Sequence, residues 1–446
     1  MFFDDSRFLC KGILAVILIG LVVRMAVGAL ITYNYDVYHW ALTISNFEAG
    51  NGLYQTAGYY YTPVWGYILG IFSRFYELFG VDMLGERFTD LLFVEDVATI
   101  SPHTAFVTSI PFNTAVTAMM ALVDLACAYL IFWIVRETYD LRKAKICFAA
   151  WFLCSFVIVV GSIGGMFDSI SALMTLLCIC MLMRGKEFLA GSLFATAVLL
   201  KLFPAFLIFI FIAYIIVKHR EEWKIRVLKA LLGAVVFTGI LMAPMVMQGT
   251  LMDSMSFIIA RTSSDALYCA DLVRLGTPVA YILAVIMAMV LGYFFIKKEH
   301  KNAERALLIY SFYMMAILFL IPGAPQYQLL LFPFLVIMAI CVDGRFRIPM
   351  AIVFLLSSIH MLSPLVMDFV SMAVYTDILS LQDWTAFYNM FDYFDGFLNM
   401  PGFDVWSTAV GFLDSMALLL VALVALKRLI TVRAESAHDG LRKDYD

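Results

Sequence analysis

Charge is scarce in this chain. Of its 446 residues, 14% are Asp, Glu, Lys or Arg and 63% are hydrophobic, whereas soluble domains carry about 25% charged and about half apolar residues. This shortage excludes an ordinary soluble core. The formal net charge is −4, and no basic patch interleaved with aromatic residues is present, so we expect no nucleic-acid partner.

The motifs of soluble catalysis are missing as well. The sequence contains no CxxC pair, no HxxxH or HExxH spacing, no GxGxxG and no Walker motif. We therefore predict no metal site and no cofactor. We also expect no nucleotide chemistry on the cytoplasmic side, because the loops predicted there are short.

What the sequence does contain is a succession of apolar runs. Runs of about 17–25 residues recur along the chain, and each can cross a bilayer as a helix. The first run, residues 12–32, includes Arg24 and lacks a small-residue cleavage site, so we interpret it as a retained helix and not a signal peptide. The predicted fold class is an all-α integral membrane protein.

Charged residues between the runs predict the topology. Basic clusters hold 24 of the 30 Lys and Arg residues, and the positive-inside rule places them in the cytoplasm. They lie near residues 7–11, 136–145, 184–186, 218–229, 297–305, 345–347 and 427–443. The acidic segments 81–111, 247–275 and 367–404 then face outward. Of the eight cysteines only Cys269 falls in an outer loop, so we expect no outer disulfide within the chain.

Two segments cannot be simple crossings in this topology. Residues 188–217 have basic clusters at both ends, so we interpret them as two short helices that meet outside near "LLKLFP", where Pro204 breaks the helix. Residues 59–79 are interpreted as a helix at, or dipping into, the outer interface. The prediction is about twelve spanning helices with outer-face interfacial helices, both termini cytoplasmic, in a cell membrane.

Residues able to do chemistry gather on the predicted outer side. Asp36 directly follows the first apolar run, Asp168 stands in a turn predicted between helices 145–163 and 169–183, and Lys201 stands at the helix break. Further outer segments carry Arg261 and Arg274, the turn "PGAPQYQ" with Gln326 and Tyr327, and His360. This layout is typical of a site assembled at one membrane face.

The chemistry available outside a membrane narrows the function. No pool of nucleotide sugars exists there, so activated sugars are linked to polyprenyl phosphates. A phosphate leaving group needs cations and no general acid, and one carboxylate is enough as general base on the acceptor hydroxyl. Glycosidases need two carboxylates because they expel an alkoxide. One outer Asp and a few outer cations fit sugar transfer from a polyprenyl phosphate.

Two stretches resemble a known family. After the first apolar run come "YDVYHW", "GNGLYQ" and "YYYTPVWGYIL", and residues 164–207 read "GGMFDSISALMTLLCICMLMRGKEFLAGSLFATAVLLKLFPAFL". In order and spacing they resemble the GT-C integral-membrane glycosyltransferases, and above all the polyprenyl-phosphate-mannose-dependent mannosyltransferases. The resemblance covers about residues 10–340, and "PQY" (325–327) is similar to a further turn of that family.

The resemblance implies a GT-C-like multi-pass bundle and a transferase. The enzyme would move a sugar, most often mannose, from a polyprenyl-phosphate donor to a glycolipid or glycan acceptor on the non-cytoplasmic face, with membrane lipid around it. The chain would be one polytopic domain. Its catalytic module covers 1–247, with a first outer loop over 33–111, followed by a variable module over 248–426 and a cytoplasmic tail over 427–446.

The resemblance also assigns residues. Asp36 matches the catalytic acidic position and Lys201 the Lys before the Pro break. We assign Lys201, Arg261 and Arg274 to the donor phosphate. The remaining substrate-binding candidates are Tyr38, His39, Tyr61, Trp65, Asp168, Gln326, Tyr327 and His360.

Other interpretations are open for these residues. Asp36 also fits a solvated helix boundary, Lys201 a snorkelling side chain, and Arg261 and Arg274 ordinary loop charges. His360 fits either packing or an acceptor-side role. The aromatic residues 59–61 and Trp65 fit an interfacial belt or a platform for a sugar ring.

Ionisable residues inside the apolar runs leave two interpretations open. Arg24 either snorkels or pairs with an acid such as Asp124, and Asp124 and Asp414 are either functional or paired for structure. For the whole chain, the alternative function is a transporter or flippase of a lipid-linked or small substrate. Broken helices fit that alternative, but the related halves common in transporters are absent.

Overall fold

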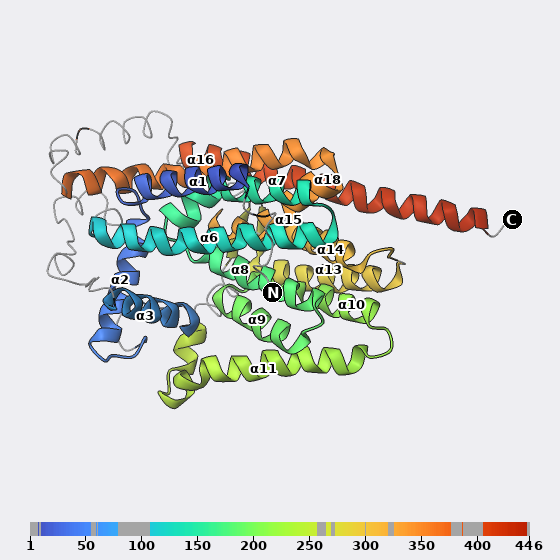
Figure 1. The fold of residues 1–446 in the computed structure, drawn as a ribbon, viewed down its shortest axis with the longest axis horizontal. Coiled ribbons are helices and arrows are strands. Elements are labelled where there is room, and N and C mark those ends of the chain that lie inside the picture. Colours follow the sequence, from blue (N-terminus) through green and yellow to red (C-terminus); the bar gives the residue numbers. More distant parts are fainter. Residues whose placement is uncertain are drawn as a thin grey trace.

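The computed structural model describes residues 8, 10–54, 59, 61–78, 108–256, 265–268, 273–298, 300–319, 325–375, 386 and 405–443. These residues form a bundle of α-helices, most of which run side by side (Figure 1). A two-stranded ribbon pairs β1 (Asp265–Tyr268) antiparallel with β2 (Val273–Gly276). The predicted class of a multi-pass helical membrane protein is confirmed.

Six helices of the described chain are long and apolar enough to cross a membrane. Helices satisfy their own backbone hydrogen bonds, which a bilayer requires. These helices are α1 (Lys11–Gly28), α6 (Ile110–Thr138), α11 (Trp223–Met247), α13 (Thr277–Lys297), α16 (Arg347–Tyr375) and α18 (Val405–Lys443). Shorter helices complete the bundle: α8 (Asp168–Met183), α9 (Glu187–Leu200), α10 (Ile208–Lys218), α14 (Ala303–Leu318) and α15 (Phe332–Ile337). The count of twelve spans stays a prediction.

One predicted helix is broken. Instead of a continuous helix over 145–163, α7 (Leu141–Phe152) and the π-helix η1 (Val157–Ile163) meet at 61°. The break frees backbone carbonyls, and the guanidinium of Arg24 satisfies one of them, donating from Nη1 to the carbonyl of Phe152 at 3.0 Å. The prediction of a single helix there is wrong, and Asp168, expected in the following turn, is the first residue of α8.

Arg24 and Asp124 form a buried ion pair that links the helices. Arg24 Nη2 lies 3.3 Å from Asp124 Oδ2, and neither side chain is exposed. The hydroxyls of Ser162 and Ser169 each donate to Asp124 at 2.7 Å. Because an unpaired charge in this interior would be costly, the pairing holds α1, α6, η1 and α8 together. The pairing interpretation is confirmed, and snorkelling of Arg24 is wrong.

The predicted break within 188–217 is confirmed. Helix α9 ends at Leu200, Lys201 is extended (φ −147°, ψ 137°), and the 3₁₀ turn η2 (Phe203–Leu207) leads into α10. Proline at the start of η2 lacks the N–H that a continuing helix would need. Glycine lets α9 pack closely on α11, because a Cβ at Gly191 would lie 1.8 Å from the carbonyl oxygen of Ala230.

Helices α2 (Asn34–Glu48) and α3 (Pro63–Glu77) lie at one end of the bundle (Figure 1). With 15 residues, α3 is about 22 Å long at the usual rise, shorter than a hydrocarbon core of about 30 Å. It packs against α2, α9 and α11. Its length fits the predicted interfacial helix better than a full crossing.

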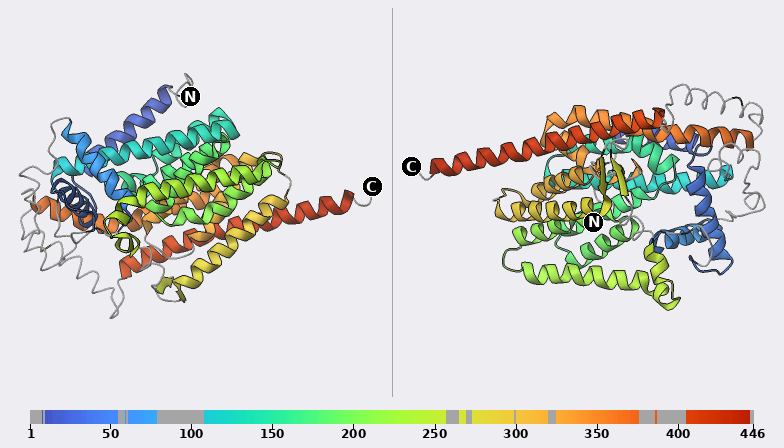
Figure 2. Two further views of the ribbon diagram at one scale, coloured as in Figure 1. Left: turned by 90° about the horizontal axis from the view of Figure 1, so that it is seen from below. Right: turned by 180° about the vertical axis from the view of Figure 1, so that it is seen from behind.

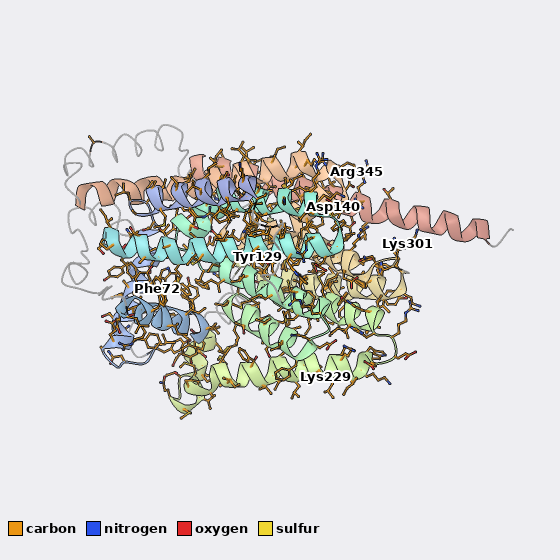
Figure 3. All side chains as sticks on the ribbon, viewed as in Figure 1. Phe72, Tyr129, Asp140, Lys229, Lys301 and Arg345 are labelled. Atoms are coloured by element: carbon orange, nitrogen blue, oxygen red, sulfur yellow. The ribbon has the colours of Figure 1, made fainter. Side chains whose placement is uncertain are left out.

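The turns that carry the basic clusters meet at the other end. Arg305 Nε donates to the carbonyl of Thr138 at 2.7 Å, and Lys218 Nζ donates to that of Met183 at 3.1 Å. Figure 3 shows Asp140, Lys301 and Arg345 toward this end, with Phe72 of α3 toward the opposite one. Figure 2 shows that the C-terminal part of α18 extends beyond the other helices of the bundle. The sequence prediction that the basic clusters share one side therefore agrees with the arrangement of the turns.

Candidate active site

Asp36 lies in the first turn of α2, where the helix N-terminus favours a carboxylate. The hydroxyl of Tyr33, the residue before the helix, donates to the carbonyl of Met361 in α16 at 3.2 Å and fixes where α2 begins. Val37 and Trp40 on the same helix are buried, while Asp36 is half-buried. The carboxylate therefore stands at the edge of the packed face of α2.

The turn "GGMFD" places Asp168 beside α2. Gly165 has φ +69°, a conformation that glycine adopts without strain, and its carbonyl accepts a hydrogen bond from Trp40 Nε1 at 3.2 Å. A Cβ at Gly164 would lie 2.3 Å from the ring of Tyr33. The two glycines thus allow the turn to lie directly on α2, and after Met166 the chain continues with the buried Phe167 and Asp168.

Lys201 reaches Asp168 from the break after α9. Its Nζ lies 3.3 Å from Asp168 Oδ2, and the two side chains are 6% and 0% exposed. A buried ammonium costs free energy unless an opposite charge accompanies it. Lys201 is therefore a fixed buried cation with Asp168 as its counter-ion, and snorkelling to a lipid headgroup is wrong for this side chain.

Three aromatic rings surround the Lys201 ammonium. The distances from Nζ to the ring centroids are 4.2 Å for Phe167, 4.6 Å for Tyr327 and 5.5 Å for Tyr61. Ring faces attract cations at these distances. We call these three residues the aromatic cage. They come from the "GGMFD" turn, from the 3₁₀ turn η3 (Pro325–Leu330) and from the segment before α3.

The charges of Lys201 and Asp168 act on Asp36. Burial raises the pKa of the Asp36 carboxyl to about 6, the Lys201 ammonium lowers it, and the Asp168 carboxylate raises it. The Asp168–Lys201 pair is thus close enough to Asp36 for both charges to act on its carboxyl, and the hydrogen bond from Trp40 to Gly165 shows that α2 packs on the turn that carries Asp168. A carboxylate with a pKa near neutrality is suited to accept a proton, and a fixed cation beside it is suited to hold an anion.

Trp65 and Tyr59 are core residues. They are 1% and 7% exposed, so the interfacial-belt interpretation is wrong for both. The ring of Trp65 stacks on Phe167 with centroids 4.9 Å apart and 15° between the planes. Trp65 therefore supports the aromatic cage from behind, and direct contact with a substrate stays a prediction for it.

Tyr38 and His39 lie on α2 close to Asp36. Both are half-buried, and their rings pack with centroids 5.5 Å apart. His39 follows Asp36 by three residues, which places the two on neighbouring sides of the helix. Its Nδ1 lies 2.6 Å from the carbonyl of Tyr35. Substrate contact by Tyr38 and His39 stays a prediction.

The other predicted residues divide into three groups. Gln326 is half-buried in η3 beside Tyr327 of the cage. His360 in α16 hydrogen-bonds to Asp414 and is taken up below. The backbone of Arg274 lies in β2, paired with Leu267, but its side chain lies outside the described structure, as does all of Arg261. The roles of both arginines stay predictions.

Sequence reasoning missed Phe167 and the partners of Asp414. Phe167 gives the shortest ring contact to Lys201, but one aromatic among 39 Phe and 22 Tyr residues carries no signal of its own. Its position directly before Asp168, in the "GGMFD" turn that resembles the glycosyltransferase family, could have identified it as a site residue. Within the described residues, no group of three or more His, Cys, Asp and Glu side chains could hold a metal ion.

Comparison with known proteins identifies a family of glycosyltransferases. The model of glycosyltransferase family 87 matches residues 101–322, about half of the chain. The match includes Asp168 and Lys201 but begins after Asp36 and ends before Tyr327. A search among curated proteins finds no match. By its family match and its helical membrane fold, the chain belongs to glycosyltransferase family 87, a GT-C-type family of membrane glycosyltransferases.

Proposed function

We propose that the enzyme is a mannosyltransferase, which transfers a sugar from a polyprenyl-phosphate donor to a hydroxyl of a glycolipid or glycan. The observation that carries the proposal is the buried Lys201–Asp168 ion pair next to α2, the helix of Asp36, with both charges acting on the Asp36 carboxyl. A single proton acceptor next to a fixed cation is what transfer from a phosphate leaving group needs. The acceptor oxygen forms a bond to the sugar C1 as the bond from C1 to the phosphate oxygen breaks.

In this reaction Asp36 is the general base. Its carboxylate takes the proton of the acceptor hydroxyl while the new C–O bond forms. The raised pKa of about 6 makes it a stronger base than an exposed aspartate, yet it remains mostly ionised at neutral pH. Burial beside the aromatic cage also lowers the local dielectric, which strengthens the interaction with charge that develops nearby.

Lys201 would stabilise the departing polyprenyl phosphate. The ammonium is already desolvated and positioned, so it need not reorganise when negative charge develops on the phosphate. The aromatic cage and Asp168 keep it in place. Arg261 and Arg274 would add further contacts to the phosphate, because a guanidinium can bind two phosphate oxygens at once.

The site would face the non-cytoplasmic side. The basic turns lie at one end of the bundle and α3 at the other, and the positive-inside rule assigns the basic end to the cytoplasm. A single-cysteine variant at Ile110, the exposed first residue of α6, should react with an impermeant maleimide from outside intact cells. Labelling only in inverted membranes would reject this orientation.

One polytopic domain would carry the activity. The predicted catalytic module, residues 1–247, supplies Asp36, Asp168 and Lys201, and Tyr327 comes from the predicted variable module. One buried core also joins both parts, from Ile13 to Ala425. We therefore expect neither module to be active alone.

The deciding experiment is a transfer assay. Purified enzyme in lipid nanodiscs is incubated with polyprenyl-phosphate-mannose and a membrane lipid extract, and lipids that gain one hexose are sought by mass spectrometry. The Asp36→Asn enzyme is the control. Movement of the lipid-linked sugar across the bilayer without any product would favour a flippase and reject the proposal.

A further inference from the structure

A further buried polar cluster lies in the described bundle, apart from the Lys201 site and from the Arg24–Asp124 pair. Asp414 of α18 accepts hydrogen bonds from Ser357 Oγ at 2.6 Å and from Gln328 Nε2 at 2.9 Å. The Nδ1 of His360 lies 3.1 Å from Asp414 Oδ2. Ionisable groups at this depth are costly, and when they occur they commonly mark functional sites.

The cluster orients the ring of His360. With Nδ1 on the carboxylate of Asp414, the other ring nitrogen, Nε2, points away from that partner. No described residue hydrogen-bonds to Nε2. The His360 side chain is 25% exposed, whereas that of Asp414 is only 3% exposed. The imidazole is therefore held at Nδ1 and partly exposed, with its Nε2 edge on the side away from Asp414.

A glycine keeps that edge open. A Cβ added at Gly411, one turn before Asp414 on α18, would lie 3.5 Å from both Nε2 and Cε1 of His360. Gly411 has no side chain to cover the ring. A larger residue at 411 would cover the Nε2 edge without touching the hydrogen bonds of Asp414.

Two connections join this cluster to the candidate active site. In η3, Tyr327 belongs to the aromatic cage of Lys201 and the next residue, Gln328, binds Asp414. In α16, the residue after His360 is Met361, whose carbonyl accepts from Tyr33, three residues before Asp36. The segments that carry the His360 cluster therefore also contact the segments that carry Asp36 and Lys201.

We propose that His360, oriented by Asp414, binds a sugar hydroxyl of the substrate through Nε2. The inference rests on the proposed function and adds a second polar contact to that site. A neutral ligand fits this position better than a phosphate, because the carboxylate of Asp414 offsets any positive charge on the ring. A sugar hydroxyl both donates and accepts hydrogen bonds, so it can pair with an imidazole nitrogen. Asp414 acts as a positioning residue.

The test uses two substitutions that act on the same nitrogen differently. In His360→Asn the amide can keep the hydrogen bond to Asp414 but has no group at the position of Nε2. Gly411→Ala adds a methyl at ordinary contact distance, 3.5 Å from Nε2 and Cε1 of His360, and covers the Nε2 edge. We expect both variants to unfold at the wild-type temperature in nanodiscs and to lose about tenfold or more in kcat/KM, the effect of one lost hydrogen bond to substrate.

The matched control is Ser358→Ala. Ser358 follows Ser357 on α16, but its hydroxyl lies 2.7 Å from that of Ser155, outside the cluster. This variant should keep full activity. A His360→Asn enzyme with wild-type kinetics, or one whose loss of activity follows only a loss of heat stability, would overturn the proposal.

The hydroxyl can belong to the donor or the acceptor, and kinetics separate the two. If it belongs to the donor, His360→Asn raises the KM for polyprenyl-phosphate-mannose but binds bare polyprenyl phosphate normally. If it belongs to the acceptor, the KM for the glycolipid extract rises and hydrolysis of the donor by water is unchanged. If neither quantity changes, the proposal fails.

Failure of the proposed function gives a different result. A wild-type enzyme that forms no product rejects sugar transfer but leaves the role of His360 measurable by binding. Polyprenyl-phosphate-mannose should then still protect the wild-type protein against heat better than bare polyprenyl phosphate does. If His360→Asn keeps both that difference and the protection by glycolipid, the binding role is overturned as well.

Discussion

The ammonium of Lys201 lies 3.3 Å from the carboxylate of Asp168, with both side chains buried. Lys201 lies in the break after α9, and Asp168 is the first residue of α8. The ion pair therefore connects the end of one helix to the start of another. In the absence of donor, Asp168 neutralises the cation that we assign to the phosphate. The pair also sets the electrostatic surroundings of Asp36.

Replacing Lys201 by Met should remove the cation and keep the packing within the aromatic cage. We expect kcat to fall about 10²–10³-fold, as when one donor to transition-state charge is lost. At least one of Arg261→Ala and Arg274→Ala should also lower turnover strongly. Transfer rates at saturating polyprenyl-phosphate-mannose measure both effects.

The controls for Lys201 are Arg74→Ala and Arg87→Ala. Arg74 forms an exposed ion pair with Glu77, and pairs of this kind contribute little to stability. Arg87 is also predicted on the outer side and has no assigned role. Both variants should be nearly as active as the wild type, and losses as large as that of Lys201→Met would mean that the phosphate site is misplaced.

The general-base role of Asp36 predicts the effect of Asp36→Asn. The amide keeps the shape but cannot take a proton, so turnover should fall about 10²–10⁴-fold, with unchanged insertion and with heat stability at neutral pH equal to or above that of the wild type. Glu48→Gln, at the far end of the same helix, is the matched control. Near wild-type turnover of purified Asp36→Asn would reject the assignment.

The two central site residues could be chosen from the sequence. Asp36 directly follows an apolar run, and Lys201 directly precedes a proline break, so both stand where helices end and polar groups can meet. Their neighbours could not be chosen in this way. Phe167 and Tyr327 become a cage only because two distant turns converge on Lys201, and an aromatic residue in a membrane protein gives no local sign of that.

The break between α7 and η1 was also beyond sequence reasoning. Residues 152–155, "FLCS", contain neither proline nor glycine. The carbonyl freed there is satisfied by Arg24, which is 128 residues away from Phe152 in the chain. Tertiary contact, and not local preference, determines this break. The pairing of Arg24 with an acid was foreseeable from its cost in a membrane, but its role at the break was not.

Transfer should require no divalent metal. Lys201 already supplies positive charge beside Asp36, and magnesium or manganese would need several oxygen ligands there. EDTA should leave the rate unchanged in enzyme washed free of metal. The predicted outer segment with Asp383, Asp392, Asp395 and Asp404 lies outside the described residues, and inhibition by EDTA that added Mg²⁺ or Mn²⁺ reverses would contradict this prediction.

The buried pair Arg24–Asp124 should be structural. Removing one partner leaves an unpaired buried charge, so Arg24→Leu and Asp124→Leu should each destabilise the fold, by about 3–5 kcal/mol. The double variant should be less destabilised than the sum of the two, because neither charge is then left alone. Heat denaturation of the four proteins in one detergent tests this, and additive losses would count against direct coupling.

The pH dependence of transfer should report the surroundings of Asp36. A general base must be ionised, so kcat/KM should fall as pH is lowered through about 6, the pKa of Asp36. The Asp168 carboxylate raises this pKa and the Lys201 ammonium lowers it. The midpoint of the acidic limb should therefore move to lower pH in Asp168→Asn and to higher pH in Lys201→Met, measured on residual activity. Because the folded-state pKa is raised, the contribution of Asp36 to stability is greatest at low pH and is lost as pH rises through about 6. Midpoints that move in the same direction in the two variants would show that Asp36 is not the group that titrates.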